Sequence, residues 1–212
     1  MKAKRLKTRL LTRVFLATTL LAGGGGLMSG ATSCAAAPDR SRATFLLLPD
    51  FPTYRDNVDP YLQRRCGTLD CHGQPGRPYR LYGFSGIRDY AEEAGSPLVS
   101  GQQPTTPGEI VANFQATIGL EPEEMSRVVA RQGQRPETLI FLRKPLKIER
   151  HKGGKLMSED DDGYRCVTAW LRIRTVRAAK DDETQIETIP DDEREKLSDR
   201  DLSACKRAQA NP

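Results

Sequence analysis

Four segments in the second half of the chain place apolar residues at the three- and four-residue spacing of an amphipathic helix. The segments begin near residues 106, 122, 136 and 158. Their apolar positions are Ile110, Val111, Phe114 and Ile118, then Met125, Val128 and Val129, then Leu139, Ile140 and Leu142, and last Tyr164, Val167, Trp170, Leu171 and Ile173. A further helix is predicted from about residue 56 into the cysteine at 66, and a final amphipathic piece carries Leu197, Leu202 and Cys205.

Local signals place the helix starts and the loops. Thr106-Pro107-Gly108-Glu109 has the pattern of a capping box with Pro at the first helical position. Ser158 with Asp161 predicts a second capping box at the start of the last core helix. Residues 73–104 are rich in Gly, Pro and Ser and are expected to be mostly loop, with a turn of helix near 87–94. The pattern predicts an all-α fold with long loops.

The first 33 residues have the organisation of a signal peptide. A basic stretch ending at Arg13 precedes an apolar run over residues 14–22, which leads into glycines and small residues. The apolar run is too short for a comfortable membrane span, so export is the better interpretation.

Ala31-Thr32-Ser33-Cys34 resembles the lipobox of bacterial lipoproteins. Cys34 is therefore the predicted lipidation site, and its lipid would anchor the chain at the periplasmic face of a membrane. Ala35 lacks the Asp-type retention signal of the inner membrane, which favours the outer membrane. Ordinary cleavage nearby and an uncleaved anchor are the alternatives.

The basic charge of the chain belongs to this leader. The net charge is +5, with 33 cations against 28 acids. Six cations precede residue 14, and the first 33 residues contain no acid, which leaves 27 cations against 28 acids, a net of −1, in the remainder. The mature chain is near neutral, so no nucleic-acid partner is expected.

Five cysteines remain to be explained, and export makes free thiols uncommon. One partition uses all of them: Cys34 is lipidated, Cys66 and Cys71 bind a cofactor, and Cys166 and Cys205 form a disulfide. In the rival partition Cys66 and Cys71 are bonded to each other. Cys166 and Cys205 could also simply be buried thiols.

Cys66-Gly67-Thr68-Leu69-Asp70-Cys71-His72 is the most informative segment. Covalent haem attachment needs two thiols that reach the two vinyl groups of one porphyrin, and an imidazole directly after the second thiol to bind iron. The common spacing has two residues between the cysteines, whereas this chain has four. A zinc site from Cys66, Cys71, His72 and His151 and a thiol enzyme using Cys71 are weaker interpretations.

The same segment supports a family resemblance. With Gly73 it resembles the attachment site of small c-type cytochrome-like domains in exported bacterial proteins. A second stretch is similar to planctomycete- and myxobacterial-type cytochrome segments that run Pro-Glu-x-Ser-Leu, Lys-Pro, His-x-Gly-Gly and a helix ending in Trp-Ile or Trp-Leu. The matching residues are Pro136-Glu137-Thr138-Leu139, Lys144-Pro145, His151-Lys152-Gly153-Gly154 and Trp170-Leu171. Over residues 55–174, the resemblance implies a small all-α, cytochrome c-like domain that moves electrons.

Counting the remaining histidines and methionines narrows the choice of the second axial ligand of the expected iron. Beyond the leader, the chain has one further histidine, His151, and two methionines, Met125 and Met157. Met125 lies on an apolar helix face and is expected in the core. His151 is the first choice for the distal ligand because Gly153-Gly154 beside it would let the backbone approach a flat porphyrin. Met157 is the second choice, and an open position is the third.

These observations together predict an exported monohaem cytochrome. The expected organisation is a signal peptide over 1–33, a tether and extended segment over 34–52, a haem domain over 53–178, and a charged tail with a short helix over 179–212. The expected function is one-electron transfer by one haem c to an unidentified redox partner protein, rather than catalysis. The alternative is a haem-free, disulfide-stabilised binding or structural lipoprotein.

Overall fold

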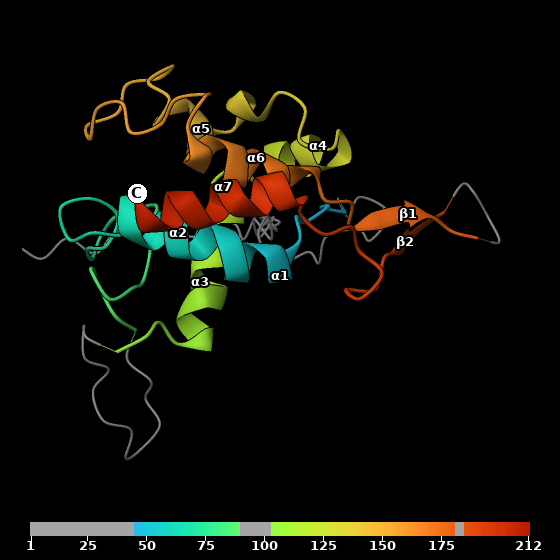
Figure 1. Cartoon of the computed structure of the whole chain (residues 1–212), viewed down its shortest axis with the longest axis horizontal. Helices are drawn as coiled ribbons and strands as arrows, with labels where there is room; N and C mark the ends of the chain where they lie inside the picture. Colours follow the sequence, from blue (N-terminus) through green and yellow to red (C-terminus); the bar gives the residue numbers. More distant parts are fainter. Residues whose placement is uncertain (1–44, 90–102, 181–184) are drawn as a thin grey trace, which may run out of the picture. The chain divides into compact units, whose positions relative to one another are not determined.

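The computed structural model describes residues 45–89, 103–180 and 185–212. The predicted signal peptide at 1–33 and the predicted lipidation site at Cys34 lie outside the described residues. Helices predominate in the described part, which confirms the all-α expectation at that level (Figure 1). The addition is a small antiparallel pair, β1 (Val176–Ala178) and β2 (Ile186–Thr188), in which Val176 is opposite Thr188.

A helical run leads up to the cysteine motif. It consists of α1 (Phe51–Thr53), a π-helical turn η2 (Tyr54–Val58) and α2 (Asp59–Arg65). The run begins five residues before the predicted start because the Asp50 carboxylate accepts a hydrogen bond from the Thr53 amide at 2.7 Å. Pro52 in the first turn supports the same start, since it has no amide hydrogen to lose there.

The helix α3 (Pro107–Ile118) begins at the predicted capping box, in which Thr106 and Glu109 exchange hydrogen bonds. Its buried face was predicted only in part, through Phe114 and through Ile118, which packs against the core. Apart from Phe114, the buried residues of α3 are polar, namely Glu109, Asn113 and Thr117. By contrast, Val111 is 40% exposed. Polar side chains can face the interior here because each finds hydrogen-bond partners on other segments.

Three short helices follow. In α4 (Pro122–Ala130) the predicted apolar residues Met125, Val128 and Val129 are buried. The helix predicted after Pro136 divides into a 3-10 turn η3 (Pro136–Thr138) and α5 (Ile140–Arg143), because the intervening Leu139 is extended. The segment ends before Pro145, as predicted.

The helix α6 (Asp162–Arg172) contributes much of the core. Trp170 is fully buried, and its indole Nε1 donates to the Asp50 carbonyl at 2.7 Å. The predicted capping box at Ser158 is wrong. The Asp161 carboxylate accepts from the Ser158 amide at 2.6 Å, so these residues form a turn ahead of the helix, and the N-cap Asp161 makes no capping hydrogen bond.

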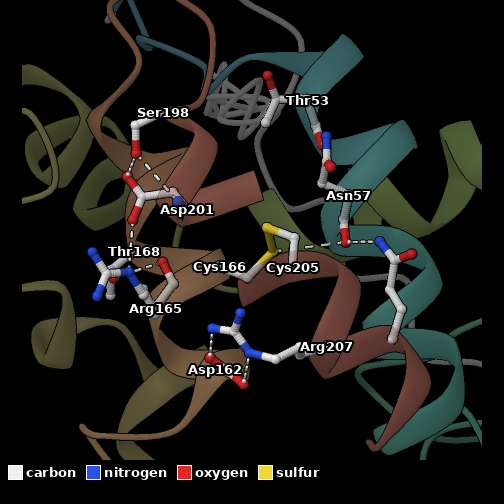
Figure 2. The surroundings of a disulfide bond; sticks show 11 residues. Thr53, Asn57, Asp162, Arg165, Cys166, Thr168, Ser198, Asp201, Cys205 and Arg207 are labelled. Carbon is white, nitrogen blue, oxygen red and sulfur yellow. Dashed lines mark hydrogen bonds and ion pairs between the residues drawn. A yellow bond between two sulfur atoms is a disulfide. The ribbon is translucent and has the colours of Figure 1, made fainter. Parts of the chain in front are cut away.

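The helix α7 (Asp199–Ala210), capped by Ser198, lies along α6 and α2 (Figure 1). The predicted disulfide between Cys166 of α6 and Cys205 of α7 is confirmed, with the two Cα atoms 4.8 Å apart (Figure 2). The predicted tail is therefore docked on the core. Within the described ranges, no helix is long and apolar enough to cross a membrane.

Candidate functional site

The site begins where α2 ends. Cys66 is the C-cap residue of α2, and from there the chain folds back on itself. The amide of His72 donates to the carbonyl oxygen of Cys66 at 2.9 Å, and the amides of Cys71 and Gly73 both donate to that of Thr68, each at 2.9 Å. The backbone alone therefore brings the second cysteine and the histidine back to the first cysteine.

Glycines allow this fold-back to be compact. A methyl group at either Gly73 or Gly86 would overlap the carbonyl oxygen of Gly67. The loop at 83–87 lies directly on the motif, because the amide of Ile87 donates to the carbonyl oxygen of Gly73 at 2.6 Å. The glycines that flank the cysteines in the motif thus serve close backbone packing.

The two cysteines of the motif are free thiols in the structure, in contrast to the bonded Cys166 and Cys205. Both are partly exposed, and Cys66 also packs against the hydrophobic core. Burial raises the pKa of the Cys66 thiol to about 12, with a smaller opposing effect from Arg65. Cys66 is therefore a neutral thiol near pH 7.

His72 is oriented by the segment that follows it. Its Nδ1 lies 2.9 Å from the carbonyl oxygen of Tyr79, and the two rings are in contact with their centroids 4.8 Å apart. Because a carbonyl oxygen can only accept, Nδ1 carries the hydrogen and Nε2 keeps its lone pair. Burial lowers the pKa of His72 most, the hydrogen bond to Tyr79 opposes this, and the nearby His151 and Arg77 lower the pKa further. The ring is thus a neutral imidazole with Nε2 available.

His151 is held in the same way from a different loop. Its Nδ1 lies 3.0 Å from the carbonyl oxygen of Gly154, so its Nε2 is likewise available. Gly154 has a φ of +80°, a conformation that favours glycine. Gly153 packs close to the imidazole, where an added Cβ would lie 3.2 Å from Cε1 of His151.

The two imidazoles face each other. The rings of His72 and His151 are nearly parallel, at 8°, and their centroids are 6.3 Å apart. A metal ion bound by two opposed imidazole nitrogens at about 2 Å each separates the ring centroids by about 6 Å. The hydrogen bond of each Nδ1 to a backbone carbonyl is also what metal-ligating histidines usually make. In separation alone, the two rings match a pair of histidines bound to one metal ion.

One arginine connects the two histidine loops. Arg65, next to Cys66, donates from both Nε and Nη2 to the carbonyl oxygen of Leu156, at 3.0 and 2.8 Å. The amide of Leu156 in turn donates to the carbonyl of Pro145 at 2.9 Å. The end of α2 is thus fixed to the loop that carries His151.

A buried polar network supports α2 from behind. The Asp59 carboxylate, 1% exposed, accepts hydrogen bonds from Gln63 Nε2 at 2.5 Å and from Asn113 Nδ2 at 2.9 Å. Asn113 also exchanges hydrogen bonds with the backbone of Tyr82. Burial raises the pKa of Asp59 from 3.8 to about 6, although its hydrogen bonds oppose the rise. The network joins α2, α3 and the loop after the motif.

The structure distinguishes the other candidate ligands by position. Met157, the second choice for the distal ligand, is 3% exposed and belongs to the hydrophobic core, as does Met125. Within the described residues, no group of three or more His, Cys, Asp and Glu side chains is arranged to hold a metal ion, so the zinc interpretation gains no support. Sequence reasoning gave Tyr79 and Arg65 no role at the site, because their contacts there are with other segments of the chain or with backbone atoms.

Comparison with known proteins adds no relative. No family model matches the chain, and no curated protein or solved structure is similar to it. Any function must therefore be argued from the residues of the site.

Proposed function

We propose that this chain is an exported monohaem c-type cytochrome that carries out one-electron transfer. In this proposal Cys66 and Cys71 form the thioether links, His72 binds the iron on the proximal side, and His151 binds it on the distal side. The observation that carries the proposal is the pair of parallel imidazole rings, with centroids 6.3 Å apart, next to two free thiols. Bound haem would supply a one-electron iron couple at this place.

The residues that hold the iron would set the reduction potential of that couple. Tyr79 and Gly154 fix the orientation of the two histidines through their carbonyl oxygens, at 2.9 and 3.0 Å. Two imidazole ligands would give a lower reduction potential than His/Met ligation, since a thioether ligand raises it. With both axial positions filled by side chains, we expect electron transfer to an as yet unidentified redox protein rather than peroxide chemistry.

The location is part of the proposal. The signal peptide and Cys34 would direct the chain to the periplasmic face of a membrane, and Ala35 favours the outer membrane. We expect Cys34→Ser to move the protein from the membrane fraction to the soluble periplasmic fraction. A full-length Cys34→Ser protein that stays in the membrane fraction would contradict the lipid anchor.

The first experiment tests attachment. The full chain is produced in an exporting bacterial host that carries the cytochrome c maturation machinery, and its intact mass and pyridine haemochrome spectrum are measured. We expect a c-type spectrum and the added mass of one haem. A colourless protein that is lighter by two hydrogens, with a bond between Cys66 and Cys71, would refute the proposal and favour a haem-free lipoprotein.

The second experiment tests the distal ligand with a matched pair of variants. His151→Ala should lose the low-spin spectrum while the haem stays covalently attached, because the thioethers and His72 are unchanged. Met157→Leu should keep the low-spin spectrum, because Met157 packs in the core. Loss in the methionine variant alone would assign the ligand to Met157, and loss in neither would reject both residues.

A further inference from the structure

A small pocket lies between the loop at 77–82 and the helix α3. Its volume is about 290 Å³. Arg77 and Arg80 line it from the loop, together with Tyr82, and Gln115 lines it from α3. The walls formed by described residues contain these two cations and no carboxylate, so the pocket is suited to an anion.

The guanidinium of Arg77 is incompletely satisfied. Its Nε is shielded from solvent and finds no hydrogen-bond partner among the described residues. A buried N–H of a charged group without an acceptor is unfavourable, because it has lost water and gained nothing in return. The two Nη groups of a guanidinium also match the two oxygens of one carboxylate, and Arg77 lines the pocket, so a carboxylate there would compensate the charge that the buried Nε leaves unpaired.

The second arginine of the pocket, Arg80, is held in place by an aromatic ring. The guanidinium of Arg80 lies over the ring of Tyr82, with Cζ 5.2 Å from the ring centroid. Stacking of this kind fixes the plane of the guanidinium and leaves its N–H groups free to donate at the edge. Ala112 and Ala116 provide an apolar wall on α3, which a short aliphatic chain could contact.

We propose that this pocket binds an aliphatic carboxylate through Arg77 and Arg80. The fork of Arg77 and the alanine wall favour a carboxylate on a short carbon chain over a fully hydrated phosphate. Such a group could come from a small carboxylate in solution or from the propionate side chain of haem. The proposal stands on the pocket alone and is independent of whether haem is attached.

The test uses the full chain produced with and without the maturation machinery. Sodium propionate and sodium succinate are titrated, with inorganic phosphate for comparison, and the Nε–H signals of the arginines are followed by NMR. We expect a saturable shift of the Arg77 signal. Arg77→Gln and Arg80→Gln should each weaken binding at least about tenfold. Arg174→Gln, at an exposed position, is the matched control and should leave binding unchanged.

The outcomes separate the two sources. Saturable binding in both preparations indicates a carboxylate from solution. Binding only without haem, with the Arg77 signal already shifted in the haem-loaded protein, indicates the propionate. No saturable shift in either preparation, or equal weakening by Arg174→Gln, overturns the proposal. If neither preparation carries haem, the cytochrome proposal fails while the pocket is still tested.

Discussion

The two cysteine pairs of this chain lie in contrasting surroundings. Cys166 and Cys205 sit on the facing sides of two helices, and both are completely buried. Cys66 and Cys71 sit at a helix end and in the loop after it, and both are partly exposed and unbonded. The first pair joins segments 39 residues apart in the sequence, whereas the second lies within one short loop.

Ion pairs reinforce the bonded pair. Beside it, Arg165 contacts Asp201 at 2.8 Å, and Arg207 contacts Asp162 at 2.7 Å, each across the same two helices (Figure 2). Such pairs lie partly in solvent and contribute little energy individually, but they join the same two helices as the disulfide. The lesson is that a cysteine pair's surroundings separate a structural bridge from thiols that remain available for a cofactor.

The largest effect is expected on haem attachment. Cys66→Ser combined with Cys71→Ser should abolish covalent haem completely, because no thiol would remain to form either thioether. Cys166→Ala combined with Cys205→Ala should retain it, because both motif thiols and His72 are still present. The measurement is the haem-to-protein ratio of the purified chains. Equal loss of haem in both variants would show that the two pairs do not have separate roles.

For stability, the same two double variants should rank in the opposite order, with the larger loss in the variant that lacks the disulfide. Closing a loop of 39 residues stabilises a fold by about 4 kcal/mol in the chain-entropy model, so the Cys166→Ala and Cys205→Ala protein should lose about that amount. The serine variant of the motif should lose less, compared with the haem-free wild-type chain. Urea unfolding of haem-free proteins gives both values. An equal loss of unfolding free energy in the serine variant of the motif would contradict the different structural roles of the two cysteine pairs.

The smallest expected effect is a dependence of stability on pH near the motif. The pKa of Asp59 rises from 3.8 to about 6 on folding, so folding favours its protonated form. This contribution is fully present below pH 3.8 and is lost as the pH rises through about 6. The free energy of unfolding should therefore fall by about 2 kcal/mol over this range relative to Asp59→Asn. Parallel pH profiles for the two proteins would refute this assignment.

Local signals predicted much of the helical framework. The capping box at Thr106, the proline that opens α4 and the apolar spacing of α6 all correspond to observed helices. The prediction for α3 failed where a distant partner decides the outcome. Asn113 can be buried because its side chain donates to Asp59 and to the carbonyl of Tyr82 and accepts from the amide of Tyr82. No periodicity of α3 contains that information.

For the candidate site, the sequence predicts which residues take part but not how they are arranged. The motif identified Cys66, Cys71 and His72, and counting narrowed the second ligand to His151 or Met157. The opposition of His72 and His151 depends on two loops that are distant in the sequence. Those loops are joined through Arg65 and the carbonyl of Leu156, a contact that no local pattern encodes.

The 39-residue separation of the disulfide would also constrain how the chain matures under the proposed export. A short loop closes faster than a long one, so an oxidant meeting the unfolded chain would first link Cys66 to Cys71. The native bridge between Cys166 and Cys205 would form later, once α6 and α7 have docked. Under the proposed haem attachment, maturation would therefore require a reductant that reopens the rapid bond while leaving the buried one intact. The exposure of the motif cysteines and the burial of the bridge provide that kinetic selectivity.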